Sequence, residues 1–135
     1  MAFADGVIAA MTVYCEASGE PQEGRIAVAA TFFNRLKSGR FGKSIAAICL
    51  ARCQYSEWND DRLDNANLLR AAVVDSHDPV MAACAEAVNA AASGMDPSLG
   101  ATHYYADTMK TPPAWAAQGT FTVQIGHHRF YKNVP

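Results

Sequence analysis

The chain has 135 residues, half of them hydrophobic and 18% charged, with 11 Lys and Arg against 13 Asp and Glu and a formal net charge of -2. This composition excludes a mainly disordered chain, and its near-neutral charge argues against a protein that binds nucleic acid phosphates. No apolar run approaches the roughly 20 residues that span a bilayer, so we expect no stable membrane insertion. The length predicts one compact domain over residues 1–135, and we expect a monomer.

The first helix is expected to begin with Asp5 as its cap and to run through about Ala17, because its apolar residues follow helical spacing. Ser18-Gly19 ends this helix, and Pro21 suits the first position of a second helix that stops at Ser38-Gly39. Further helices are expected over residues 45–50, 68–74 and 80–92, with Ser44 capping the first of these and Asp78-Pro79 starting the last.

The character of the sequence changes after Gly100, where aromatic and β-branched residues predict short strands. The expected strands cover residues 101–106, 121–125 and 129–131, and Gly126-His127 lies where a hairpin could turn. A helical body followed by a small β element defines an α+β fold class of a mainly helical kind.

The four cysteines do not have the spacing of a zinc finger, and each lies among aliphatic residues, where a thiol behaves as a small hydrophobe. A disulfide that involves Cys49 or Cys53 is a second interpretation. Cys15 is followed by an acidic residue and not by a cation, so a nucleophilic thiol is not expected there.

Glu16 is the most informative residue, because it lies in the last turn of an otherwise apolar helix. The partial negative charge of a helix C-terminus and the apolar neighbours both favour the protonated form of a carboxyl group. A protonated carboxyl is what a glycosidic leaving oxygen needs as a general acid. From its position alone, Glu16 would more often be an exposed Glu at a frayed helix end than a catalytic acid.

Glu20 follows four residues later, but Gly19 and Pro21 interrupt the helix between the two carboxylates. It is either a second catalytic carboxylate or a cap for the second helix. We favour the cap, because Glu20 directly precedes Pro21 at the positive end of that helix.

A resemblance now adds to these observations. Residues 16–36, EASGEPQEGRIAVAATFFNRL, resemble the motif that opens the cell wall hydrolase family of the spore-cortex-lytic enzymes. Four later segments match the family in the same order. They are CQYSEWND, GATHYYAD, TPPAW and IGHHRFYKN. The resemblance therefore extends from about Val13 to Lys132. Ser18, Arg25, Tyr55 and Glu57 depart from the usual residues.

The resemblance implies a lysozyme-like fold that cleaves the glycan strand of peptidoglycan between N-acetylmuramic acid and N-acetylglucosamine, without a cofactor. It implies a lytic transglycosylase in which Glu16, the first Glu of the motif, is the catalytic acid and base, and in which Glu20 has a supporting role. A hydrolytic muramidase is the alternative, and would need a second carboxylate about 5–9.5 Å away. Its candidates are Glu20, Glu57 and Asp60.

Several polar and aromatic residues are expected to support the site or bind sugars. The candidates are Gln54, Tyr55, Ser56, His103, Tyr104, Tyr105 and Trp115. Tyr104 and Tyr105 alternate across a strand, so one is expected to face the cleft, where it could stack on a sugar or bond Glu16, and the other to be core. No metal is expected, because His103, His127 and His128 form no paired ligand motif.

The N-terminus lacks the cationic region of a signal peptide, since the first charge is Asp5. An enzyme that acts on the wall would then be made in the cytoplasm and released, as a phage endolysin is, or be a mature fragment of an exported bacterial wall-remodelling enzyme. Competing hypotheses are a non-catalytic carbohydrate-binding module that uses Trp58, Tyr105 and Trp115, and an inhibitor or structural domain.

Overall fold

The computed structural model describes residues 1–51 and 77–135. The expected helix over residues 68–74 lies outside the described residues, as do Cys53, Gln54, Tyr55, Ser56, Glu57, Trp58 and Asp60. The described helices are α1 (Phe3–Ala17), α2 (Gln22–Ser38), α3 (Ile45–Leu50) and α5 (Pro79–Ala92), and the strands are β1 (His103–Ala106), β2 (Thr120–Ile125) and β3 (His128–Lys132).

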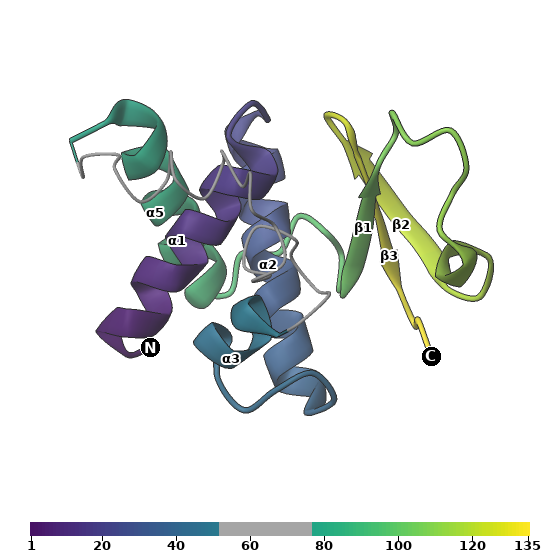
Figure 1. Ribbon diagram of the computed structural model, residues 1–135, viewed down its shortest axis with the longest axis horizontal. Helices are drawn as coiled ribbons and strands as arrows, with labels where there is room; N and C mark the ends of the chain where they lie inside the picture. Colours follow the sequence, from purple (N-terminus) through teal and green to yellow (C-terminus); the bar gives the residue numbers. More distant parts are fainter. Residues whose placement is uncertain (52–76) are drawn as a thin grey trace, which may run out of the picture.

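The helices form one side of the molecule and the three strands form the other (Figure 1). α5 packs along both α1 and α2, and α3 packs against α1. The buried faces of these helices are rich in alanine, whose small side chain allows the backbones to approach closely; they include Ala9, Val13, Ala27, Ala30, Val88 and Ala91. Among the described residues, no helix is long and apolar enough to cross a membrane.

Three predicted helix boundaries are confirmed with the predicted chemistry. The Ser44 hydroxyl accepts the Ala47 backbone N–H at 3.0 Å at the start of α3. At the start of α5, the Asp78 carboxylate accepts the backbone N–H groups of Val80 and Met81, which no helical carbonyl can reach. Gly39 ends α2 with φ 75°, a conformation that favours glycine.

Two predicted caps are wrong. α1 begins at Phe3, so Asp5 lies within its first turn, and its carboxylate accepts the Ala46 N–H at 2.9 Å, which joins α1 to α3. Glu20 does not cap α2, because Pro21 occupies the N-cap position and no side chain bonds the first turn. In both cases a distant backbone N–H satisfies the carboxylate.

The strands form an antiparallel sheet in the order β1-β3-β2, with an irregular register in β2 between Phe121 and Val123. Gly126 and His127 form the predicted hairpin turn between β2 and β3. The pairing of Tyr104 with Phe130 places both side chains on one face of the sheet, and Phe130 belongs to the core shared with the helices.

The opposite face of the sheet carries a second group of rings, which we call the outer aromatic cluster. Its members are His103, Tyr105, Trp115, Phe121 and Tyr131. Trp115 comes from the short 3-10 helix η2 (Ala114–Ala117) and contacts three of the other four rings. The cluster therefore packs the segment between β1 and β2 against the sheet.

Candidate active site

Glu16 lies where the helical body meets the sheet. It is half-buried in the last turn of α1, and the Tyr104 hydroxyl of β1 donates a 2.5 Å hydrogen bond to its Oε1. The two residues are 88 positions apart in the chain. The hydrogen bond fixes one carboxyl oxygen, and no described residue donates a hydrogen bond to the other. This arrangement suits a carboxyl group that must point in one direction to exchange a proton.

Arg25 holds the end of α1 that carries Glu16. Its guanidinium donates to the carbonyls of Ala17 at 3.3 Å and Ser18 at 2.5 Å, and also to the Gln22 side chain. A cation at these carbonyls is favourable, because the last carbonyls of a helix have no helical partner and carry partial negative charge. Sequence reasoning missed this role, and the signal available was a basic residue one helical turn into α2.

Glu20 leaves the helices and reaches the β2–β3 hairpin. It is only 8% exposed, and its Oε1 accepts the His127 backbone N–H at 2.9 Å. His128 Nδ1 lies 3.3 Å from the same oxygen. A carboxylate engaged in this way has little freedom to activate a water molecule, which argues against Glu20 as the second catalytic carboxylate.

His128 is a buried residue that sequence reasoning did not assign to the site. It is 8% exposed, and its ring lies 4.9 Å from that of Tyr104 between ring centres. Burial lowers the pKa of His128, while the nearby carboxylates of Glu20 and Glu16 act in the opposite direction. Strand alternation was the signal that could have found it, because His128 and Phe130 share a face.

Tyr104, and not Tyr105, is the tyrosine at Glu16. The expectation that the other tyrosine is core is wrong, because Tyr105 lies half-buried in the outer aromatic cluster, with its ring stacked 5.7 Å from Tyr131. His103 and Trp115 lie in the same cluster. His103, Tyr105 and Trp115 are therefore on the face of the sheet away from Glu16. For His103 and Tyr105 the reason is that side chains alternate between the two faces of the sheet along β1.

His103 is electrostatically unlike an ordinary surface histidine. Burial, followed by the positive charges of Arg35 and Arg40, lowers its pKa to about 4. Arg35 is itself buried, and its guanidinium donates to the Thr102 carbonyl at 2.6 Å and lies 4.6 Å from the ring centre of Phe41. His103 therefore stays neutral around neutral pH.

Potential metal ligands do not converge in the described parts of the chain, where no three His, Cys, Asp or Glu side chains gather. His103 and His128 lie on opposite faces of the sheet, and the exposed His127 imidazole faces Asp107 at 3.2 Å.

Cys84 is buried in α5, where desolvation raises its pKa to about 11.

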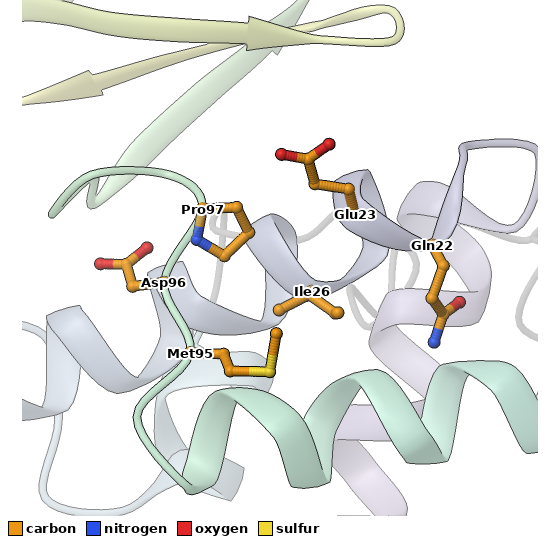
Figure 2. Close-up of a pocket in the computed structure, with 6 residues that line it drawn as sticks. All are labelled: Gln22, Glu23, Ile26, Met95, Asp96 and Pro97. Carbon is orange, nitrogen blue, oxygen red and sulfur yellow. The ribbon is translucent and has the colours of Figure 1, made fainter.

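A separate pocket of about 470 Å³ lies between α2 and the loop that follows α5 (Figure 2). Ile26 and Met95 point toward one another inside it, with Gln22, Glu23, Asp96 and Pro97 around them. Its described lining includes none of the residues expected at the site, so the pocket is distinct from the Glu16 region.

A mainly helical body with a small three-stranded sheet agrees with the fold class that the sequence predicted, and a half-buried glutamate lies where the two meet. The chain belongs to the cell wall hydrolase family, whose model matches residues 19–131.

Curated relatives include spore cortex-lytic enzymes of Bacillus subtilis and Oceanobacillus iheyensis, each 31% identical to this chain over 90% and 91% of its length. The chain spans only 35% and 40% of the length of these two relatives.

Two solved structures share the fold, each with a TM-score of 0.76. One is the catalytic domain of the germination-specific lytic transglycosylase SleB from Bacillus anthracis, at 23% identity over 98% of this chain and 97% of that one. The other is the catalytic domain of the Bacillus cereus SleB protein, at 24% identity over 97% and 91%.

Proposed function

We propose that this chain cleaves the glycan strand of peptidoglycan between N-acetylmuramic acid and N-acetylglucosamine, as a lytic transglycosylase with Glu16 as its acid and base. The observation that carries the proposal is the half-buried Glu16 carboxyl, oriented by the Tyr104 hydroxyl at the junction of helices and sheet. Membership of the cell wall hydrolase family supports the substrate class. The name of the Bacillus anthracis neighbour supports the reaction type.

The reaction needs one carboxyl group in two successive roles. Glu16 first donates its proton to the glycosidic oxygen, so that the bond from this oxygen to C1 of N-acetylmuramic acid breaks and the N-acetylglucosamine hydroxyl leaves. The 6-hydroxyl of the same muramic acid then attacks C1 and returns a proton to the Glu16 carboxylate. The product carries a 1,6-anhydro ring, and the acid is restored without water.

The intramolecular route agrees with the surroundings of Glu20. Because the nucleophile belongs to the substrate, no second carboxylate is needed near Glu16. A hydrolase would require one, and Glu20 already accepts the hairpin N–H of His127 while buried beside His128. This observation counts against Glu20 as the second carboxylate of a muramidase, while Glu57 and Asp60 lie outside the described residues.

The proposal is tested with purified peptidoglycan sacculi and mass spectrometry of the released fragments. We expect wild-type protein to release anhydromuramyl ends, and Glu16→Gln to lose cleavage by at least about a thousandfold while still binding sacculi. Glu86→Gln is the control, because Glu86 is an exposed carboxylate of α5. Reducing muramic ends would establish a muramidase instead, and normal cleavage by Glu16→Gln would refute the assignment of the acid.

We further propose that the enzyme works at the cell wall as a monomer, with peptidoglycan as its partner. The names of the curated relatives point to spore cortex as one substrate, while a phage endolysin or a bacterial wall-remodelling enzyme would act on vegetative walls. Comparing the digestion of purified spore cortex with that of vegetative sacculi distinguishes a cortex substrate from a vegetative-wall substrate. Sedimentation of the purified chain tests the monomer.

A further inference from the structure

The buried imidazole of His128 has no part in the proton transfers described above, although it lies beside the residues that perform them. Its ring packs on that of Tyr104, whose hydroxyl bonds Glu16, and its Nδ1 faces Glu20. Among the described residues, Nδ1 is buried without a partner in hydrogen-bond geometry, although Glu20 Oε1 is only 3.3 Å away.

Glu20 is held firmly in this position. Its carboxylate accepts the His127 backbone N–H, and Gly126 provides the space it occupies, because a β-carbon at position 126 would lie 2.6 Å from Glu20 Oε2. Glu16 lies in the last turn of α1 and Glu20 in the segment that joins α1 to α2, so two carboxylates four positions apart both contact the sheet. Glu16 accepts a hydrogen bond from Tyr104 of β1, and Glu20 accepts one from the backbone of the β2–β3 hairpin.

We propose that Glu20 and His128 act together as a positioning pair, which holds the ring of Tyr104 so that its hydroxyl keeps the Glu16 carboxyl in its reactive orientation. The proposal rests on the proposed catalytic role of Glu16. Glu20 Oε1 faces the imidazole at Nδ1, 3.3 Å away, and the imidazole packs on the Tyr104 ring next to Phe130, whose ring lies 5.6 Å from that of Tyr104 and 6.2 Å from the imidazole. Neither member of the pair touches the substrate.

The electrostatic surroundings of His128 agree with this role. The groups that face it are Glu20 and Glu16 from the helical side, and His127, Asp107 and the Tyr104 ring from the sheet side. Burial keeps the imidazole neutral around neutral pH, since its pKa is lowered. In a neutral imidazole with its proton on Nδ1, this N–H lies beside Glu20 Oε1, 3.3 Å away.

Three variants test the pair. Glu20→Gln removes the negative charge, His128→Phe keeps a ring against Tyr104 but no donor, and His128→Asn keeps a donor near the Nδ1 position but no ring. On soluble glycan strands we expect kcat to fall about 10- to 100-fold in each, because misplacing a catalytic group costs this much, with KM changed less than about twofold. Circular dichroism selects conditions in which every variant is folded.

The double variant Glu20→Gln/His128→Phe gives a sharper result. Residues that act as one unit lose little more together than singly, so we expect its kcat to match that of the worse single variant. Losses that multiply would show two independent structural effects and overturn the pair. Unchanged kcat in the folded single variants would overturn it as well.

A readout independent of activity is the NMR titration of the His128 imidazole. Because the Glu20 charge opposes the effect of burial, Glu20→Gln should move the titration midpoint to lower pH. Glu86→Gln is the matched carboxylate control and His77→Gln the histidine control, both at exposed positions. A midpoint that Glu20→Gln leaves unmoved would refute the contact.

The variants distinguish an error in the proposed positioning pair from an error in the proposed function. Cleavage that survives Glu16→Gln refutes the catalytic assignment and leaves the His128 titration interpretable. An inactive Glu16→Gln beside fully active Glu20 and His128 variants refutes the pair alone.

Discussion

The hydroxyl of Tyr104 and the carboxyl of Glu16 join β1 to the last turn of α1 through one 2.5 Å hydrogen bond. Among the described residues, no other hydroxyl donates to this carboxyl. The orientation of the proposed acid is therefore set by the sheet, although the acid itself belongs to a helix.

Removing this hydroxyl is the most direct test of the site. In Tyr104→Phe we expect kcat for sacculus cleavage to fall about 10- to 100-fold, because the carboxyl loses its orienting donor. The free energy of unfolding should fall by only about 1 kcal/mol, since the ring still packs on His128 and Phe130. Tyr105→Phe is the matched control, because it loses a hydroxyl on the other face of the sheet. Equal losses of activity in both variants would contradict this assignment.

Gly126 makes room for Glu20, so its substitution should cost more than backbone strain alone. An added β-carbon would lie 2.6 Å from Glu20 Oε2, at a φ of 56° that side chains rarely adopt. We expect Gly126→Ala to lower the free energy of unfolding by about 2–4 kcal/mol in urea titrations.

Gly39→Ala provides the comparison for this substitution. Gly39 has a φ of 75° but no atom within 4 Å of an added β-carbon, so only the conformational cost of about 1 kcal/mol is expected. Equal losses at the two positions would show that Glu20 does not need the space at Gly126.

The stability of the fold should depend on pH through His103. Its pKa is about 4 in the folded chain and near 6.5 when unfolded, so the unfolded chain binds the extra proton first as pH falls. We therefore expect the free energy of unfolding to be highest above about pH 6.5 and to decrease as pH falls toward 4. Buried His128 contributes in the same direction.

Urea titrations of wild type and His103→Phe from pH 7 to pH 4 check this expectation. The aromatic substitution retains a ring beside Phe41 and Trp115 but does not titrate. Its curve should be flatter than that of the wild type. An identical slope for both proteins would exclude His103 as a source of the pH dependence.

Asp78 offers a stability change that should leave activity intact. Asp78→Ala leaves the first N–H groups of α5 without their side-chain acceptor, so we expect a loss of about 1 kcal/mol in the free energy of unfolding. Asp78→Asn retains an oxygen acceptor and should recover most of this loss. Thermal unfolding and sacculus cleavage are measured on the same preparations, and a large drop in kcat would contradict the purely local role.

Local signals predicted the helix boundaries well where the partner lies within the next few residues. Ser44, Asp78 and Gly39 act on N–H or carbonyl groups close in sequence, and their roles follow from residue type and position. Asp5 and Glu20 are acidic residues of the same kind, but their carboxylates accept N–H groups 41 and 107 positions away. Spacing along the chain holds no information about such partners.

In the candidate site, too, features set by local sequence could be predicted and contacts between distant segments could not. Glu16 was identified from its unfavourable place at a helix end and from the family motif, and strand alternation correctly separated Tyr104 from Tyr105. Alternation alone could not show which of the two faces the helices, because both faces of this sheet bury aromatic rings. The role of His128 depends on contacts with Glu20 and Tyr104 that exist only after the hairpin has packed on the α1–α2 turn.

The span of 88 positions between Glu16 and Tyr104 also makes the site a late product of folding. Contacts of long sequence separation form after local helices, since closing a long loop has an entropic cost. During synthesis, a chain that has been made only as far as α5 already contains Glu16 but lacks Tyr104, whose hydroxyl orients the Glu16 carboxyl. Cleavage activity therefore reports that β1 has packed against the end of α1.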